Sequence, residues 1–436
     1  MTSTSDRSST CPDQVIEQIF RAEWGRLLSL LVSRTRRLDL AEDALGEAFA
    51  RASDHWTGEG VPANPAGWLY TTAYRHVVGR LRAEAIAGRK APLLAVRPGW
   101  VPSDDTQEEL ADDRLQLILL CCHPALPRES RSALALRLVV GTPTERIARL
   151  FLVPPSTMAA RLTRAKKKIL LAGIPIGAPL DDELRSRLDE VCRTIYLAFT
   201  AGYTPGDGPD LLRADLAGDA VRLAAVLHDL VPDATQLRAT LALLLLQHSR
   251  RDARQRQGRL VTLADQDRSM WYHDEIRAGL GLAARLQPEE GFAEELRLQA
   301  LIAAEHARAP TAAATDWTAI AGHYADLEAR TGSAIVRLNR AVAVAEVEGP
   351  RAGLALIAGL DDVLRDNHRV AAVRAELARR VGDTELARTS YRKAIRLCSN
   401  DVERTHLRAR LDALVTSVHA EVDRPTGGRV LHSRRV

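Results

Sequence analysis

The stretch that most constrains the fold runs from Thr142 to Lys168 and predicts two short helices joined by a tight turn. The first helix must end at Val153-Pro154-Pro155, because proline lacks a backbone donor and restricts the residue before it. The second helix opens at Ser156 or Thr157. Its apolar residues recur at spacings of three and four: Met158, Leu162, Ala165 and Ile169. This arrangement predicts a helix-turn-helix, which DNA-binding proteins place in the major groove.

The opposite face of the second helix is cationic, and no acidic residue occurs from Pro155 to Leu170. Its basic residues are Arg161, Arg164, Lys166, Lys167 and Lys168. Such a face suits contacts with DNA phosphates and base edges. An ordinary helical hairpin with a solvated basic face has the same pattern, so periodicity alone leaves both interpretations open.

Composition favours an all-α protein, because alanine and aliphatic residues dominate and only 4% of the 436 residues are aromatic. This length allows two to four domains. The net charge of +4 is mild, so any argument for nucleic acid rests on local clusters. The five scattered cysteines predict no disulfide framework, and the sequence shows neither a signal peptide nor an apolar run long enough for a membrane span. We therefore expect a soluble, cytoplasmic protein with no membrane partner.

Residues 12–90 read as a first helical domain, after a polar N-terminus expected to be disordered. A helix that begins near Leu38 carries an acidic face formed by Asp39, Glu42, Asp43 and Glu47. A Gly/Pro loop follows, and the next helix starts at Trp68. Basic and aromatic side chains interleave along it, at Trp68, Tyr74, Arg75, Arg80 and Arg82, and the polar Asn64 lies in the loop before it. Single-stranded nucleic acid is bound by surfaces of this kind, although a tryptophan at a helix start more often belongs to the core.

Residues 91–113 are expected to form an acidic linker, and residues 114–172 a second domain that contains the helix-turn-helix. A solvated tether and a mimic of nucleic acid are both compatible with the acidic linker. Within the second domain, Cys121-Cys122-His123 precedes Pro124. Adjacent cysteines do not readily ligate one tetrahedral ion, so we interpret this stretch as a buried helix end and predict no metal site.

The second half, residues 182–415, reads as helical throughout and contains no catalytic constellation. Gly349 and Gly382 lie 33 residues apart in two similar segments, close to the period of tetratricopeptide (TPR) helical hairpins. A generic α-helical bundle is the alternative. We expect residues 416–436 to form a disordered tail, and we predict neither an enzyme nor a cofactor.

Several motifs resemble bacterial RNA polymerase sigma factors. The run from Glu145 through Val153 to Lys166 resembles sigma region 4. The stretch from Asp39 to Phe49, followed by Trp56, resembles region 2 of the extracytoplasmic-function (ECF) type. The helix that begins at Trp68 also resembles part of region 2. The chain departs from the family at Gly46, where glutamine is usual, and at Gly79 in this later helix, where the family often has a polar contact. The long C-terminal half resembles the ECF subgroup that carries a TPR-like extension.

This resemblance implies a sigma factor that binds core RNA polymerase, recognises −10 and −35 promoter elements and is regulated by its C-terminal domain. The implied −10 contacts are Asn64, Trp68, Tyr74, Arg75, Arg80 and Arg82. The implied −35 contacts are Ser156, Thr157, Ala160, Arg161, Thr163, Arg164 and Lys167. The implied polymerase contacts are Asp39, Glu42, Asp43 and Glu47.

The implied partners are the clamp helices of the largest polymerase subunit, the beta flap, promoter DNA and an unknown regulatory protein or ligand at the C-terminal domain. Two other classes of function remain open. A helix-turn-helix repressor would bind duplex DNA and would not need the domain from Pro12 to Arg82. A TPR-type scaffold would use the C-terminal half to bind a protein segment.

Overall fold

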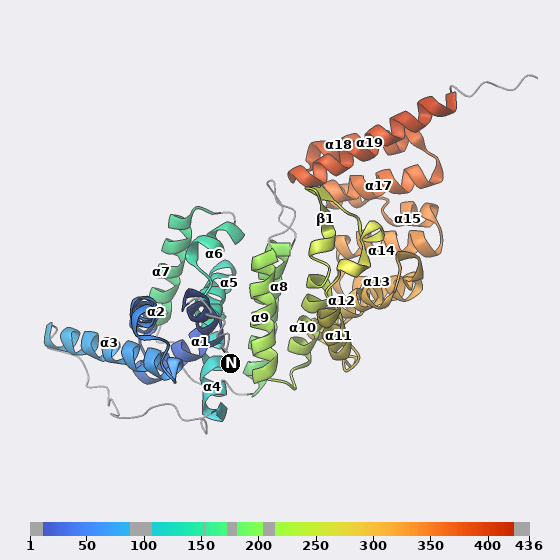
Figure 1. Ribbon diagram of the computed structural model, residues 1–436. Coiled ribbons are helices and arrows are strands. Elements are labelled where there is room, and N and C mark those ends of the chain that lie inside the picture. The colour runs from blue at the N-terminus through green and yellow to red at the C-terminus, as the bar shows by residue number, and fades with distance from the viewer. Residues whose placement is uncertain (1–11, 88–106, 152, 172–180, 204–213, 423–436) are drawn as a thin grey trace, which may run out of the picture. The chain divides into compact units, whose positions relative to one another are not determined.

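The computed structural model describes residues 12–87, 107–151, 153–171, 181–203 and 214–422 (Figure 1). These residues are almost entirely helical, which confirms the predicted all-α class. They fall into two compact units, the first within Met1–Tyr203, Arg213–His248 and Gly281–Arg297, the second within Thr204–Leu212, Ser249–Leu280 and Leu298–Val436. Among the described helices, none combines the length and the apolar character that crossing a membrane requires.

The first unit begins with ten α-helices, drawn from blue to green in Figure 1. They are α1 (Pro12–Thr35), α2 (Leu38–Glu59), α3 (Pro65–Ala87), α4 (Gln107–Cys121), α5 (Arg128–Ala135), α6 (Thr144–Leu150), α7 (Pro155–Leu171), α8 (Asp181–Tyr203), α9 (Ala214–Leu230) and α10 (Thr235–His248). A π-helical turn, η2 (Leu136–Val140), follows α5.

The core of α1 to α3 follows from the helical spacing of apolar side chains. On α1, Leu27, Leu28 and Leu31 are fully buried at spacings of one, three and four. An aromatic cluster joins α1 to α2, with the ring of Phe20 centred 4.8 Å from Trp24 and 4.9 Å from Phe49. These contacts fix the orientation of α2, which carries the predicted polymerase contacts.

Glycines allow η2 to lie directly against α1. Gly141 ends η2 in the left-handed conformation (φ 80°) that glycine favours at a helix cap, and a Cβ there would lie 2.7 Å from Cε1 of Phe20. On α1, a Cβ at Gly25 would lie only 2.3 Å from the carbonyl oxygen of Val139. The backbone of η2 therefore packs on α1 in van der Waals contact.

We expect Gly25→Ala to destabilise the protein by about 1–3 kcal/mol, because the new methyl group would collide with a backbone carbonyl that has no rotamer to adjust. The matched control is Gly46→Ala, since nothing lies within 4 Å of a Cβ at this helical position. Replacing Gly46 should raise stability by up to about 1 kcal/mol through helix propensity. Urea unfolding of both variants measures this difference, and equal effects at the two sites would contradict the close packing of α1 on η2.

The second unit contains a small hairpin and a series of helices. Its elements include η3 (Asp252–Arg254), β1 (Gln255–Arg256), β2 (Arg259–Leu260), η4 (Leu263–Asp265), η5 (Arg268–Met270), η6 (Ala312–Ala314), α13 (Trp317–Thr331), α14 (Ala334–Val347), α15 (Pro350–Leu356), α16 (Leu360–Val363), α17 (His368–Val381), α18 (Thr384–Leu397) and α19 (Asp401–Val422). The helices α11 (His273–Ala283) and α12 (Gly291–Arg308) have residues in both units. The strands pair antiparallel, with Gln255 opposite Leu260.

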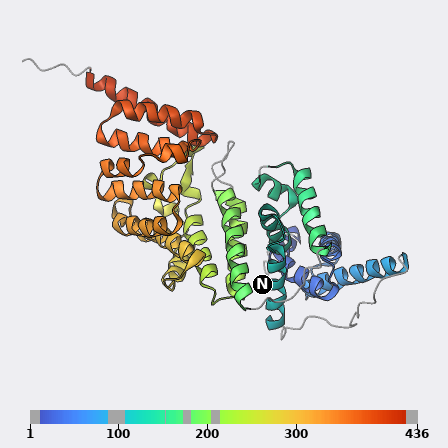
Figure 2. The ribbon, with the colours of Figure 1, turned by 180° about the vertical axis from the view of Figure 1, so that it is seen from behind.

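Helical hairpins occur where the sequence predicts them, and α13 to α19 are stacked in succession in both views (Figure 2). Gly349 (φ 94°) separates α14 from α15, and Gly382 (φ 84°) separates α17 from α18. Small residues let α17 and α18 approach closely, because Ala375, Ala378 and Ala387 are fully buried in one core.

Three expected boundaries differ from the structure. Residues 107–113 belong to α4, so the acidic linker is shorter than predicted, because a helix tolerates this charged sequence in its first turns. The helix α19 continues to Val422, beyond the predicted start of the tail at residue 416. The helices α8 to α10 belong to the first unit, so the region expected as one domain over 182–415 is divided between the two units. The predicted disordered N-terminus, most of the linker and residues 423–436 lie outside the described residues.

Candidate nucleic-acid interface

The helices α6 and α7 form the predicted helix-turn-helix. The amide of Val153 donates to the carbonyl of Ala148 (3.1 Å) as α6 ends, and the amide of Met158 donates to the carbonyl of Pro154 (3.1 Å) as α7 begins. Pro155 is the first residue of α7, one position before the predicted start. Proline suits this position, since its missing N–H has no helical partner there.

The two faces of α7 separate as the sequence predicts. Met158, Leu162, Ala165 and Ile169 are buried. Six of the seven predicted −35 contacts are exposed: Ser156, Thr157, Ala160, Thr163, Arg164 and Lys167. The seventh, Arg161, is half-buried. The structure therefore brings these side chains onto one solvent-facing surface, which we call the α7 face.

The two arginines of the α7 face differ in the contacts that their side chains make within the protein. The Nε of Arg164 donates to the carbonyl of Ala160 one turn earlier (3.2 Å), and its side chain is exposed. Arg161 lies 6.0 Å above the ring of Phe151 and places Nη2 3.5 Å from Oε2 of Glu129. Arg164 is therefore better placed than Arg161 to reach a ligand without breaking contacts within the protein.

A hollow on the surface of α3 gathers half of the predicted −10 contacts. Asn64, Trp68 and Arg75 line a hollow of about 290 Å³ together with Gly67, Thr71 and Thr72. The Oδ1 of Asn64 accepts a hydrogen bond from the amide of Gly67 (2.8 Å), so Asn64 fixes the start of α3. The indole of Trp68 stacks on His55, with centroids 5.9 Å apart, and lies edge-on to Trp56.

The other predicted −10 contacts lie outside this lining. Tyr74 stacks on the buried Tyr70 (5.8 Å between centroids), while Arg80 and Arg82 are exposed further along α3. Sequence reasoning missed Thr71 and Thr72. The helical spacing of Trp68, Thr71, Thr72 and Arg75 would have placed them on the same face.

Three of the four predicted polymerase contacts remain accessible on α2. Asp43 is exposed. Asp39 pairs with the Nη2 of Arg37 (2.9 Å), and this guanidinium lowers the pKa of the Asp39 carboxyl. Glu47 pairs with Arg51 (2.5 Å) and with Nδ1 of His76 (2.8 Å). Each of these carboxylates retains contact with solvent.

Glu42 departs from the expectation that it faces solvent, because its side chain is buried. Its Oε1 accepts from the Nε of Arg137 (2.7 Å) and its Oε2 from the Nζ of Lys166 (2.8 Å). Arg137 belongs to η2 and Lys166 to α7. One carboxylate of α2 therefore contacts both η2 and α7, and the cations that enclose it explain its 5% exposure.

The helix-turn-helix segment is also held by α8 and α9. The hydroxyl of Thr142 donates to Oδ2 of the buried Asp219 (3.0 Å), and Arg146 lies 3.6 Å from the same oxygen. Arg131 of α5 pairs with Glu190 of α8 (2.5 Å). Two helices of the C-terminal half thus contact the residues that support α7.

Two family models match the chain. Residues 116–169 match the model described as sigma-70, region 4, and residues 187–287 match a family of unknown function (DUF6596). A protein of Rhizobium meliloti (strain 1021), described as uncharacterized, is 38% identical over 399 residues, which are 89% of this chain and 93% of the relative. The chain belongs to the same protein family as this relative. No solved structure matches the chain.

The region 4 match spans the C-terminal part of α4, all of α5 and α6, and α7 as far as Ile169. It supports a sigma factor family for this chain and, at that level, interaction with RNA polymerase and promoter DNA. The second match covers most of α8 and all of α9 to α11, which include the two helices that hold Thr142 and Arg131. A bare hairpin with a solvated basic face, the alternative interpretation of residues 142–168, does not account for the region 4 match.

Proposed function

We propose that this protein is a sigma factor of the ECF type, which binds core RNA polymerase, recognises −10 and −35 promoter elements and initiates transcription. The observation that carries this proposal is the α7 face, where six predicted −35 contacts are exposed within a segment that matches sigma region 4. Its cations supply phosphate contacts, and Arg164 can read a base edge in the major groove.

The hollow on α3 supports a role in opening the −10 element. Its wall combines the amide of Asn64, the indole of Trp68 and the guanidinium of Arg75. An unstacked base requires a ring to pack against and polar groups for its edge, and a nearby cation attracts the strand backbone. The threonine hydroxyls of Thr71 and Thr72 add hydrogen-bonding groups to the same wall.

Burial of Glu42 implies that polymerase binding is coupled to a change within the first unit. If Glu42 contacts the polymerase, it must first leave Arg137 and Lys166. The packed arrangement of α2 against η2 and α7 is then a resting state. Core polymerase would bind more tightly to a state in which α2 is separated from η2 and α7, and binding would therefore stabilise that state.

The proposed regulation by the C-terminal half has a physical route through α8 and α9. Glu190 and Asp219 hold the residues that support α7, so a change in either helix acts directly on the helix-turn-helix. The glycine-separated hairpins α14–α15 and α17–α18 support a TPR-like architecture for the remainder of this regulatory region. A regulatory protein or ligand would act there.

Association with core RNA polymerase tests the proposal. The full-length protein should co-elute with core enzyme, and the two together should make thymines of the −10 element reactive to permanganate. Binding to −35 duplex without association with core enzyme would instead favour a helix-turn-helix repressor.

A further inference from the structure

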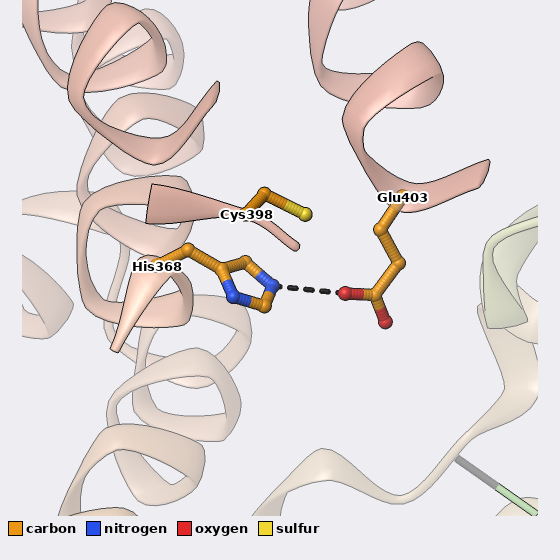
Figure 3. A group of neighbouring side chains, drawn as sticks. All are labelled: His368, Cys398 and Glu403. Atoms are coloured by element: carbon orange, nitrogen blue, oxygen red, sulfur yellow. Dashed lines mark hydrogen bonds and ion pairs between the residues drawn. The ribbon is translucent and has the colours of Figure 1, made fainter. Parts of the chain in front are cut away.

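Three side chains with metal-binding chemistry meet in the second unit. His368 begins α17, Cys398 follows the end of α18, and Glu403 lies in the first turn of α19 (Figure 3). One nitrogen, one sulfur and one carboxylate oxygen lie within 4.8 Å of one another. The Nε2 of His368 is 2.9 Å from Oε2 of Glu403, and the sulfur of Cys398 points toward the space beside them.

The backbone around these residues is fixed by capping interactions. The Oδ1 of Asn367 accepts from the amide of Arg369 (3.0 Å) at the start of α17. The Oδ1 of the buried Asn400 accepts from the amides of Val402 (3.1 Å) and Glu403 (3.0 Å). Rigid supports of this kind hold metal ligands in position before the ion arrives.

We propose that His368, Cys398 and Glu403 form a binding site for zinc. Imidazole, thiolate and carboxylate are the three ligand types that zinc accepts, at about 2.0–2.3 Å. In tetrahedral geometry these bond lengths place ligand atoms about 3.3–3.8 Å apart. The observed separations of 2.9 Å to at most 4.8 Å require shifts of about 1 Å or less, which side-chain rotation supplies.

Charge around the cluster fits a divalent cation. A thiolate and a carboxylate together carry two negative charges, which balance the ion. Arg369 approaches the other carboxylate oxygen of Glu403, Oε1, at 3.7 Å, and Arg404 donates to the carbonyl of Cys398 (3.0 Å). Both guanidinium groups therefore leave Oε2 and the sulfur available. The thiol of Cys398 contacts the carbonyl of Asn400 at 3.4 Å, and zinc would replace its proton.

The fourth position of the ion would face a cavity. His368 and Glu403 line a cavity of about 830 Å³ within the second unit, together with apolar residues such as Val373 and Leu377. Sites with three protein ligands keep a position for water or an exogenous donor. The site would therefore take water, or a small molecule with a thiolate or carboxylate group, from the cavity.

Cobalt(II) substitution tests the site directly, because a thiolate ligand produces a charge-transfer band in the near ultraviolet. Full-length protein, reduced and treated with chelator, should bind one equivalent of cobalt(II) with this band, and zinc should displace it. Cys398→Ser should abolish the band and weaken zinc binding by more than about tenfold in a competition assay with a chromogenic chelator. Glu403→Gln should retain the band and also bind zinc more weakly.

Two control variants test whether a cysteine or a histidine outside the cluster binds the metal ion instead. Cys192→Ser changes a buried cysteine of α8, and His406→Gln changes a half-buried histidine of α19. Both should bind cobalt(II) as the unmodified protein does, and circular dichroism confirms that each variant remains helical. No band in the unmodified protein, or a band that survives Cys398→Ser, would overturn the proposal and leave His368 and Glu403 as an ion pair between α17 and α19.

Discussion

Arg164→Ala should weaken binding to −35 duplex DNA by about 1–3 kcal/mol, or roughly fivefold to more than a hundredfold. Arg164 is exposed on the α7 face, and its Nε donates to the carbonyl of Ala160 on its own helix. The substitution should therefore leave the fold intact. It removes a guanidinium group whose N–H donors can bind the edge of a base. Fluorescence anisotropy with a labelled duplex measures the change.

Lys168→Ala is the control for this prediction. Lys168 is exposed in the last turn of α7, where its charge contacts phosphates in the proposed complex. Its loss should weaken binding to all sequences alike. It should also reduce the slope of log K against log salt concentration by about one, because one counterion fewer is released on binding. Arg164→Ala should in addition reduce discrimination between the promoter and altered −35 sequences. Equal behaviour of the two variants would contradict the assignment of base readout to Arg164.

Glu42→Ala should lower the free energy of unfolding by about 2–3 kcal/mol. Removal of one partner from a fully buried pair costs about 3–5 kcal/mol, and partial solvent access to Arg137 and Lys166 reduces this cost. The side chains of these cations are 26% and 22% exposed. Without the carboxylate, two positive charges from different elements would face each other with no anion between them. Urea unfolding monitored by circular dichroism measures the loss.

Asp43→Ala provides the matched control, because Asp43 is the neighbouring residue on α2 and is exposed. Its removal should change stability by less than about 0.5 kcal/mol. The two variants remove the same charge, so a difference between them isolates the contact of Glu42 with Arg137 and Lys166. A similar small effect for both would show that this contact does not hold α2 against η2 and α7.

Local features of the fold could be predicted from the sequence because they depend on neighbouring residues. Pro154 and Pro155 set the turn before α7, Gly141 ends η2, and the spacing of Met158, Leu162 and Ala165 identifies the buried face of α7. The exposure of the α7 face follows from the same periodicity. These features require no knowledge of distant contacts.

Features that depend on long-range contacts escaped prediction. Glu42 reads as part of an exposed acidic face, and its cationic partners lie 95 and 124 residues away in the sequence. The hydrogen bond from Thr142 to Asp219 spans 77 residues, and Asp219 lies on α9, which belongs to the first unit together with α8 and α10. Similarly, His368 and Glu403 are 35 residues apart, so the sequence contains no short metal-binding motif that would predict their proximity to Cys398.

Run-off transcription with core RNA polymerase tests the central claim most directly. The template carries the promoter that precedes the neighbouring genes of this protein, and core enzyme alone serves as the blank. A sigma factor should produce a transcript only when both proteins are present, and Arg164→Ala should reduce its amount. Duplex binding without a transcript and without association with core enzyme would contradict the account.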